Sequence, residues 1–549
     1  MIDSEAGGGN NSPWAVPQRH DRTGRVLEQL IGEGRVDLAL THFAQAATTV
    51  IVPGDLIASE NVRVAVVATL NMLVRFVGRV RLLVAGEASN QSTETLHADI
   101  AWLNAIDSRR RIERITQLDP KADIARIWIG ASPPSDICDD KTDVCITLDS
   151  WSCTLARGCS LGDMVASDLP FGALIGSCFA TAEVFKNCVV AALLPDEAST
   201  FRMRFTAEWS FSAWVGDRIK IEDRAGIEAI SSKRKQLHPQ HLVQIGAGAV
   251  GNASSLALSR VGGMQGSYDV FDAKLVDDTN LNRCYFFRDG DIQNPKVHIL
   301  AREAVCCSFK VVPHHRSFAA NDLKAAQIVL STVDNNEARH SAQENLPPIL
   351  IEGATSNTTV AVSLHRPLNK RSCMVCRHPD RNLGSSRLIP LSVEETANLL
   401  GLSEVDVASG TFGGQMNITD ELIERVAAKS EQAAEVLREA RNRGHDLCGA
   451  LGDLRTDLGT ISGPREASVP FVSNLAGVLA AAEVVKELLR QAGTEAPELD
   501  NVLELDLLRD YSRNAKLSFR EPPREDCAFC QARQSSIESV LRRRDEHQR

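Results

Sequence analysis

The residues with the clearest potential for chemistry are three glycines between a predicted strand and a predicted helix. Residues 242–245 form a short apolar run typical of a strand, and residues 253–261 follow the apolar spacing of a helix. The glycines stand ahead of that helical pattern, in the order Gly246, Gly248 and Gly251. Glycine allows backbone N–H groups to approach phosphate oxygens, and the positive end of the following helix favours an anion. This order of elements indicates a phosphate-binding turn.

A carboxylate after the next strand makes this prediction more specific. Residues 268–271 predict a second strand, and Asp272 follows it, about 20 residues beyond the glycines. At that place a carboxylate can accept both hydroxyl protons of a ribose. A nucleotide is therefore the expected ligand, although a dehydrogenase would show the same pattern.

Polar residues farther along the chain distinguish hydride transfer from triphosphate chemistry. The sequence N-L-N-R contains Asn280 and Arg283, Lys296 follows a proline, and Asp334 follows a predicted strand at 328–330. An Arg, a Lys and an Asp that converge on a phosphate turn are the groups needed to hold a triphosphate and its Mg2+. Hydride transfer needs none of them, so the sequence favours ATP chemistry.

These motifs resemble those of the adenylation domain in the ubiquitin-activating (E1) and ThiF/MoeB family. That family has G-x-G-x-x-G, an acidic residue after the second strand, N-L-x-R, P-K and T-D-N, and both order and spacing agree with this chain. The resemblance implies that Asp272 binds the ribose of ATP and that Asp334 binds Mg2+. It also implies that Arg283 and Lys296 bind the triphosphate and act in catalysis, with Asn280 as a further nucleotide-binding residue.

Two positions depart from the pattern of the family. Lys274 stands where a second Asp is usual, and Cys284 stands where Gln usually follows N-L-x-R. These departures affect the details of ATP contact and leave the class of reaction unchanged.

Two pairs of cysteines indicate a metal site. Each pair has the spacing Cys-x-x-Cys, which can present two thiolates to one tetrahedral ion. The four residues are Cys373, Cys376, Cys527 and Cys530. The pairs lie too far apart for a zinc ribbon, so spacing alone leaves two unrelated pairs as an alternative. The family has its zinc ligands at these two places, and the resemblance therefore implies one structural Zn2+ site.

A repeated segment predicts that the fold occurs twice. Residues 170–186 contain P-F, A, A-E-V and K at spacings that recur, shifted by 300 positions, in residues 470–486. Both segments read as apolar, alanine-rich helices, and in the family such a helix closes the sheet of the adenylation domain. We therefore expect two copies of one fold. A chance similarity between two alanine-rich helices is the alternative.

The first copy lacks the groups for ATP. Residues 48–52 and 79–85 predict strands, with a helix between them at 62–77. The turn at 53–58 lacks the three-glycine pattern, and no set of Arg, Lys and Asp follows it. This arrangement resembles a eukaryotic-type E1, in which an inactive half joins an active half with pseudo-twofold symmetry. The predicted domains are a disordered lead-in at 1–20, an inactive adenylation-like domain at 21–236 and an active adenylation domain at 237–549.

The active half also contains a helical insertion, at 377–466, with a candidate nucleophile. Its helices are predicted at 393–400 and 421–440. Cys448 follows them in a glycine-interrupted stretch, outside both Cys-x-x-Cys pairs. A thiolate there is suitably placed to attack an acyl adenylate, and the family has its thioester cysteine between the same landmarks. The alternative for Cys448 is a buried structural cysteine, as expected for Cys306 and Cys307 in a predicted apolar helix.

The N-terminal region contains a candidate catalytic arginine. Asp21, Arg22 and Arg25 match in part the D-R-Q-x-R opening of the family, whose first Arg reaches the ATP of the partner domain. The resemblance implies that Arg22 reaches the ATP site within the same chain. The Gln is absent, and a solvated arginine is the alternative.

Composition and charge limit the classes of function. Of the 549 residues, 43% are hydrophobic and 24% are charged, as in a globular protein with room for several cores. The formal net charge of -11 argues against a general nucleic-acid-binding protein. With 14 cysteines, no signal peptide and no long uncharged apolar stretch, we expect a reduced, cytoplasmic protein that does not act at a membrane.

The sequence therefore predicts an α/β protein with two Rossmann-like adenylation domains in pseudo-twofold arrangement, a small helical catalytic-cysteine insertion and a structural zinc site. The resemblance implies E1-like activation, as in bacterial ubiquitin-like conjugation systems. A ubiquitin-like protein is adenylated at its C-terminus with ATP, forms a thioester on a cysteine and passes to an E2-like partner. One alternative is a sulfur-carrier or peptide adenylyltransferase of the ThiF/MoeB type without a thioester. A non-catalytic scaffold is the other, and the set of Arg283, Lys296 and Asp334 argues against it.

Overall fold

The computed structural model describes residues 17–538 with interruptions. The positions within this span that are not described are 108, 119–122, 132, 134–142, 158–162, 225–226, 228–235, 240, 307, 368, 380–392, 402–417, 443–467, 512–516, 528 and 531–536. The chain divides into two compact units. The larger consists of residues 1–23, 39–379 and 468–549, and the smaller of residues 24–38 and 380–467.

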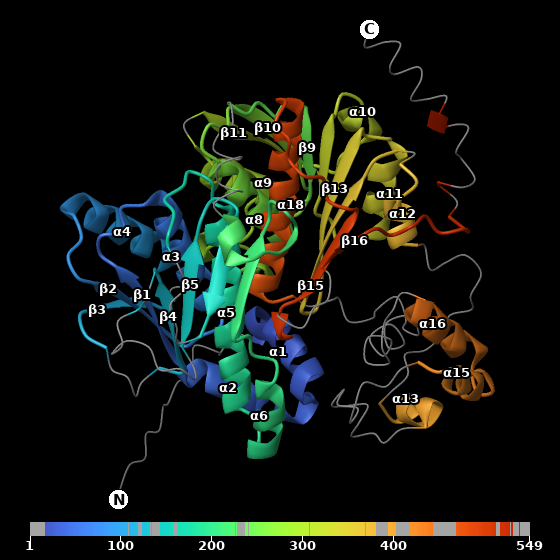
Figure 1. Ribbon diagram of the computed structural model, residues 1–549, viewed down its shortest axis with the longest axis horizontal. Coiled ribbons are helices and arrows are strands. Elements are labelled where there is room, and N and C mark those ends of the chain that lie inside the picture. The colour runs from blue at the N-terminus through green and yellow to red at the C-terminus, as the bar shows by residue number, and fades with distance from the viewer. Residues whose placement is uncertain are drawn as a thin grey trace, which may run out of the picture. The chain divides into compact units, whose positions relative to one another are not determined.

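The larger unit contains two eight-stranded sheets with the same strand order (Figure 1). The first sheet has the order β3-β2-β1-β4-β5-β6-β7-β8 and the second the order β11-β10-β9-β12-β13-β14-β15-β16. In each sheet the first five strands along this order are parallel, and the last three are joined by antiparallel pairings. The two sheets are therefore two copies of one Rossmann-like fold, as the sequence predicts.

The strands have the following bounds. The first sheet consists of β1 (Ala47–Pro53), β2 (Arg79–Ala85), β3 (Ile112–Ile115), β4 (Ala125–Ile129), β5 (Val144–Leu148), β6 (Ser152–Ala156), β7 (Glu208–Ser212) and β8 (Asp217–Arg218). The second sheet consists of β9 (Leu242–Ile245), β10 (Gly266–Phe271), β11 (Phe309–His314), β12 (Ile328–Ser331), β13 (Ile349–Ser356), β14 (Thr359–His365), β15 (Val502–Asp506) and β16 (Ser518–Phe519). The central strands β4, β5, β9 and β12 are buried along their whole length, which explains their nearly continuous apolar sequences.

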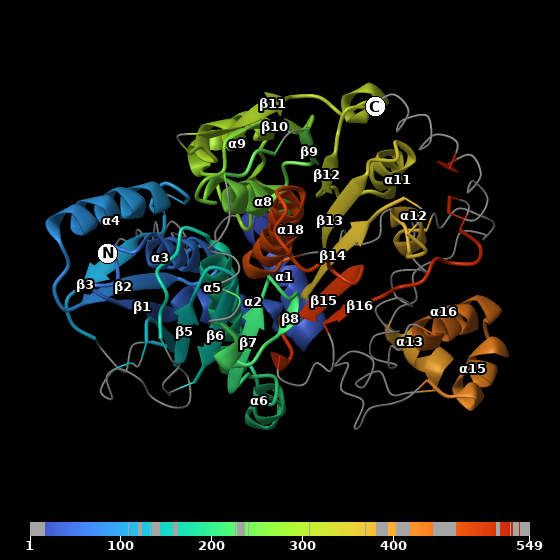
Figure 2. The same cartoon turned by 45° about the horizontal axis from the view of Figure 1, so that its top comes forward.

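Helices accompany both sheets of the larger unit (Figure 2). In the first half the helices are α1 (Pro17–Ile31), η1 (Glu33–Arg35), α2 (Val36–Gln45), α3 (Glu60–Leu73), α4 (Asn90–Leu103), α5 (Phe171–Ala191), α6 (Pro195–Arg202) and η2 (Ile221–Asp223), of which residues 24–38 belong to the smaller unit. In the second half they are α8 (Ala249–Ser259), η3 (Asp278–Asn280), η4 (Asp289–Asp291), α9 (Lys296–Glu303), α10 (Ala320–Leu323), α11 (Asn336–Glu344), α12 (Met374–Arg377) and α18 (Pro470–Gln491). The predicted helix at 62–77 thus ends earlier, at Leu73.

The repeated alanine-rich segments form the long helices α5 and α18, which pack against each other and against their own sheets. Small residues allow this close packing: a Cβ atom at Gly477 would lie 2.3 Å from the carbonyl oxygen of Val250 in α8. By length and composition α5 could also cross a membrane, but 94% of its apolar window is buried inside the protein. A core helix passes the same test, so α5 is weak evidence for a membrane span.

Two buried ion pairs relate the halves to each other. Lys186 binds Glu183 at 2.7 Å and donates to the carbonyl oxygen of Arg509 in the second half at 2.9 Å. Lys486 binds Glu483 at 2.6 Å and donates to the carbonyl oxygen of Trp214 in the first half at 3.1 Å. Since these lysines are equivalent in the repeat and each reaches the other half, the contacts are reciprocal, as in a pseudo-twofold arrangement.

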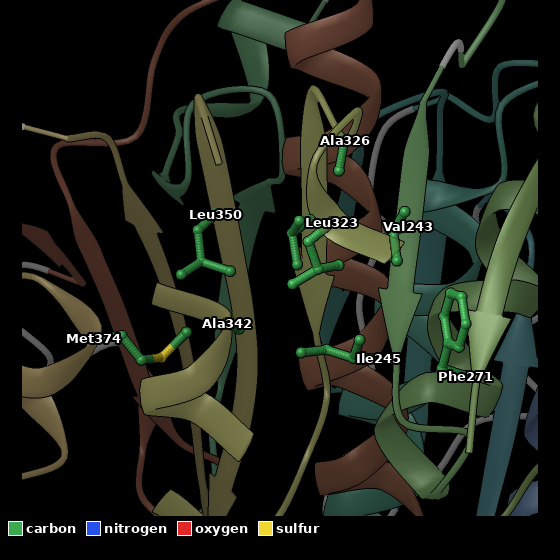
Figure 3. Packing of buried hydrophobic residues seen from close by; sticks show 9 residues of the cluster. Val243, Ile245, Phe271, Leu323, Ala326, Ala342, Leu350 and Met374 are labelled. Atoms are coloured by element: carbon green, nitrogen blue, oxygen red, sulfur yellow. The ribbon is translucent and has the colours of Figure 1, made fainter. Parts of the chain in front are cut away.

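The second sheet has an apolar core on the side of α10 and α11 (Figure 3). Val243 and Ile245 of β9 and Leu350 of β13 contribute to this cluster together with Phe271 at the end of β10. The cluster fixes the ends of β9 and β10, and the glycine turn and Asp272 begin directly after these ends.

The smaller unit contains three described helices from residues 380–467: α13 (Val393–Leu400), α15 (Asp420–Ala427) and α16 (Glu431–Asn442). The prediction of one helix at 421–440 is wrong, because the chain leaves α15 after Ala427 and begins α16 at Glu431. The hydroxyl of Ser430 accepts a hydrogen bond from the Ala433 N–H at 3.3 Å, and this favours a new helix start. Cys448 lies outside the described residues.

Two further expectations differ from the structure. Helix α1 begins at Pro17, within the segment expected as a lead-in. Cys306 is half-buried and lies in a β-bridge with Phe309, because α9 ends at Glu303 before it reaches this cysteine. Its neighbour Cys307 lies outside the described residues.

Candidate functional site

The glycine turn connects β9 to α8 in a conformation that requires glycine. Gly246 has φ +99°, which side chains rarely adopt. A Cβ atom at Gly251 would lie 2.3 Å from the carbonyl oxygen of Gly246. No described atom lies within 4 Å of a Cβ position at Gly248, the residue that precedes α8. The turn is therefore tight on its inner side, and its middle glycine faces open space at the N-terminus of a helix, where an anion is favoured.

Buried side chains that the sequence analysis missed hold this turn. Gln244 donates to the carbonyl oxygen of Gly246 at 2.9 Å and to that of Gly251 at 3.2 Å. Asn252 donates to the carbonyl oxygen of Ala247 at 3.0 Å. The sequence could have pointed to both residues, because each is a polar amide within a buried apolar element. They satisfy carbonyl groups that would otherwise be orphaned in the interior.

Asp272 lies at the end of β10, next to the glycine turn. One of its carboxylate oxygens accepts the Ala247 N–H at 2.8 Å, and the other accepts the Lys274 N–H at 2.7 Å. These bonds fix the carboxylate beside the backbone that would receive the phosphates. The structure thus brings Asp272 and the three glycines together in the positions that the sequence predicts.

The N-L-N-R segment carries polar groups without partners. Asn280 is held in a reciprocal cap with Asp277, at 3.1 Å in both directions. Asn282 is 4% exposed, and neither its amide nitrogen nor its oxygen has a partner among the described residues. Nη1 of Arg283 is also buried and unpartnered there. Buried polar atoms without partners are costly, and a bound anion would satisfy the arginine.

Lys296 begins α9 and is only 6% exposed. Its charge and that of Arg283 both act on the buried thiol of Cys284. Burial raises the pKa of this thiol, whereas the positive charges of Arg283, Lys296 and Arg75 act to lower it. Several cations therefore act on one neutral thiol, and a polyphosphate would stabilise these cations.

Asp334 follows β12 and has a mostly exposed side chain. The ammonium of Lys274 lies 3.6 Å from its carboxylate, and the two side chains are 65% and 80% exposed. Desolvation would raise the pKa of Asp334, but Lys274 and neighbouring hydrogen bonds outweigh this effect and hold the pKa below its ordinary value. Asp334 is thus an ionised carboxylate in contact with solvent, which fits a ligand of Mg2+.

The remaining predicted catalytic residues are not placed. Arg22 belongs to α1, but its side chain is not described, and Cys448 lies outside the described residues. The roles assigned to these two residues therefore stay predictions.

The four cysteines of the Cys-x-x-Cys pairs form one cluster. Their sulfur atoms lie within 4.8 Å of one another, with Cys373 3.7 Å from Cys527 and Cys376 3.4 Å from Cys530. The alternative of two unrelated pairs is therefore excluded. Four thiols at this separation fit the tetrahedral coordination of Zn2+, with the cluster buried against Leu346 and other apolar side chains.

A doubled Rossmann-like fold, with one glycine turn and a buried arginine Nη1 that has no partner among the described residues, is typical of a nucleotide-binding protein. A profile of the ThiF family matches residues 223–528, more than half of the 549 residues. The chain belongs to the ThiF family, the E1-like and ThiF/MoeB group. It is also similar to the uncharacterized protein y4jF of Sinorhizobium fredii (strain NBRC 101917 / NGR234), with 24% identity over 436 residues that cover 76% of this chain and 78% of that protein.

Proposed function

We propose that this protein is an E1-like enzyme that activates a ubiquitin-like protein with ATP. The carrying observation is that a chain with two Rossmann-like halves has the glycine turn, Asp272, Arg283, Lys296 and Asp334 in the half that matches the ThiF family, with departures at Lys274 and Cys284. An inactive half joined to an active half is the arrangement expected of an E1. The ThiF/MoeB-type sulfur-carrier activators have one copy of the fold.

The first step is adenylation of the C-terminal carboxylate of the ubiquitin-like protein. A carboxylate oxygen bonds to the α-phosphorus of ATP, the bond between the α- and β-phosphates breaks, and pyrophosphate leaves with the electron pair. The cations of Arg283 and Lys296 stabilise the charge on the departing phosphates, and Asp272 orients the ribose. Asp334 would hold Mg2+, which neutralises triphosphate oxygens when bound.

In the second proposed step the adenylate becomes a thioester. The thiolate of Cys448 forms a bond with the acyl carbon, and AMP leaves with the electrons of the acyl–oxygen bond. Transfer to a thiol of an E2-like partner follows as a thioester exchange. The Cys373, Cys376, Cys527 and Cys530 cluster would bind a structural Zn2+ and take no part in these steps.

The alternative is a sulfur-carrier or peptide adenylyltransferase, which uses the same ATP site but forms no thioester on the enzyme. Exchange of labelled pyrophosphate into ATP in the presence of a ubiquitin-like protein tests the first step. A reducing-agent-sensitive adduct on non-reducing gels tests the second step. Cys448→Ala should keep the exchange and eliminate the adduct. If the wild-type chain supports exchange but never gives the adduct, the alternative becomes the better account.

A further inference from the structure

An arginine of the first half lies against the phosphate-binding segment of the second half. Arg75 follows the end of α3 and is 3% exposed. Its Nη1 group donates to the carbonyl oxygen of Leu281, and its Nη2 group donates to the carbonyl oxygen of Tyr285 at 2.8 Å. These two carbonyls bracket Arg283. In the described backbone neither of them accepts an N–H group, so the first half supplies their hydrogen bonds.

Asn71, a residue of α3, strengthens this contact. Asn71 is fully buried and accepts a hydrogen bond from Nε of Arg75 at 3.0 Å. Its own amide donates to the carbonyl oxygen of Tyr285 at 3.1 Å. The oxygen of Tyr285 thus receives two hydrogen bonds from the first half. The hydrogen bond to Asn71 fixes the orientation of the Arg75 guanidinium. The hydrogen bonds of this guanidinium then hold the turn that contains Arg283.

The same turn is tied to the glycine turn from the other side. The N–H of Phe286, directly after Tyr285, donates to the side-chain oxygen of Asn252 at 3.1 Å. Asn252 in turn donates to the carbonyl oxygens of Ala247 and Gly248. A continuous chain of hydrogen bonds therefore runs from α3 of the first half, through the segment around Arg283, to the backbone that would bind phosphates.

We propose that Arg75 is a positioning residue by which the inactive half sets the geometry of the ATP site in the active half. It fixes residues 281–285 and so directs Arg283 toward the triphosphate. This inference rests on the proposed function, because it assumes that Arg283 binds ATP. Through Arg75 the first half contributes to the ATP site. This contribution does not depend on Arg22, whose side chain is not described.

The charge of Arg75 adds to this role. Burial lowers its pKa to about 10, so the guanidinium remains protonated at neutral pH. All its described hydrogen-bond partners are neutral oxygens, on Asn71, Leu281 and Tyr285. The carboxylate of Asp107 acts to raise the pKa of Arg75 and so helps to keep this buried charge.

The test compares Arg75→Met with Arg75→Lys in the full chain. Met retains most of the apolar stem without donors, whereas Lys keeps the charge and can donate to only part of the set. In Arg75→Met we expect KM for ATP in pyrophosphate exchange to rise about 10- to 100-fold, with a smaller change in kcat, because misplacement of a binding group by about 1 Å has effects of this size. Arg75→Lys should recover part of the loss.

Hydrogen exchange without nucleotide measures the positioning directly. The backbone amides of residues 282–287 should exchange at least about tenfold faster in Arg75→Met than in wild type, as expected for a turn that loses about 1.4 kcal/mol or more of local stability. Arg81→Met is the matched control. Arg81 is a buried arginine of the first half, paired with Asp123 at 2.7 Å, so its loss should lower thermal stability and leave this segment and KM unchanged.

The possible outcomes separate this inference from the proposed function. If hydrogen exchange of residues 282–287 is unchanged in Arg75→Met, the role of Arg75 is overturned. Faster hydrogen exchange with an unchanged KM for ATP overturns it as well. If wild-type protein neither binds ATP nor supports pyrophosphate exchange, the proposed function fails, and hydrogen exchange still decides whether Arg75 fixes the turn. If Arg75→Met does not fold, Asn71→Leu removes one donor to Tyr285 and should show the same changes at smaller size. The absence of any change in Asn71→Leu would then count against the proposal.

Discussion

The two halves share a backbone arrangement but differ in the atoms that could bind a nucleotide. In both halves the strand before the turn, β1 or β9, is followed by a glycine whose N–H donates to the carbonyl oxygen of the last residue of the neighbouring strand. Gly54 donates to Ala85 at 2.7 Å, and Gly246 donates to Phe271 at 2.9 Å. The strand register agrees, since Pro53 pairs with Ala85 and Ile245 pairs with Phe271. The sheet and the start of the turn are thus the same.

The halves differ at the residue that follows the neighbouring strand, which is β2 in the first half and β10 in the second. The residue that follows β10 is Asp272, whereas the residue that follows β2 is Gly86, with φ +81° and no carboxylate. A Cβ atom at Gly54 would lie 2.3 Å from the carbonyl oxygen of Glu87, so the backbone after β2 already fills the space beside the first turn. The fold therefore depends on the sheets and their packing. Nucleotide binding depends on a few positions at the strand ends.

The arginines after α3 and α8 show how the first half is still used. Arg75 is buried and holds a turn of the second half. Arg260, which ends α8, has a side chain that is 41% exposed and lies 3.5 Å from Glu60 of the first half. The arginine after α3 is therefore buried in its contact with the second half, whereas the arginine after α8 remains partly exposed in its contact with the first. This asymmetry is expected if one half supports and the other half reacts.

The largest difference between the halves should appear when Asp334 loses its carboxylate. Asp334→Ala should lower exchange of pyrophosphate into ATP by about 100- to 1000-fold or more, because removal of one preorganised electrostatic group has effects of this size. The exposed position of Asp334 predicts little change in thermal stability. Glu87→Ala is the control, since it removes an exposed carboxylate beside the corresponding turn of the first half. Undiminished exchange in Asp334→Ala would reject the proposed site.

The next largest effect concerns the cysteine cluster of the second half. Metal analysis should find about one zinc per chain, because four thiolates hold one tetrahedral ion. Cys527→Ser should lower the zinc content and reduce the melting temperature by several degrees, since a structural site contributes folding free energy. Cys306→Ser changes a half-buried cysteine outside the cluster and should alter neither quantity. Full zinc retention in a Cys527/Cys530 double variant would show that the pairs do not share an ion.

Tryptophan fluorescence can show which half of the protein loses stability in Cys527→Ser. All six tryptophans lie between Trp14 and Trp214, so their emission reports mainly the first half, together with the contact of Trp102 with Tyr285 of the second half. The buried Lys186 and Lys486 contacts connect the halves, and we expect tryptophan unfolding to shift together with the loss of zinc. Tryptophan unfolding that stays at the wild-type temperature would show that the halves unfold independently.

A smaller effect should follow from pH, through His365 of β14. Burial lowers the pKa of His365 from 6.5 to about 4. Between these values the unfolded chain binds a proton that the folded chain does not, so stability falls as pH falls, by up to about 3 kcal/mol for this group. His365→Gln should reduce this decline in urea unfolding between pH 6.5 and 4.5, with zinc measured in parallel because thiolates also protonate. His97→Gln, in the first half, should leave the decline unchanged.

The sequence predicts the candidate nucleotide-binding residues better than it predicts the residues that hold them in place. Gly246, Asp272 and the two Cys-x-x-Cys pairs were identifiable because each depends on local spacing or on a strand end, whereas the joining of the two pairs was implied only by the resemblance to the family. Arg75 was not identifiable, because its partners lie about 200 residues away and only the folded chain brings them together. Its one signal was the spacing of four residues between Asn71, near the end of α3, and Arg75, directly after that helix. The break between α15 and α16 was missed because helix propensity alone does not locate a serine cap.

The smallest expected effect concerns Lys274, which has no carboxylate where the family usually has a second Asp. Its ammonium lies 3.6 Å from Asp334 and competes with Mg2+ for that carboxylate. Exposed ion pairs contribute about 0.2–1 kcal/mol, so Lys274→Asp should lower the Mg2+ concentration for half-maximal exchange by about two- to fivefold. Lys274→Ala separates loss of the ammonium from gain of a carboxylate and should give a smaller shift in the same direction. A higher Mg2+ requirement in both variants would mean that Lys274 assists the triphosphate directly and that the ion pair with Asp334 is incidental.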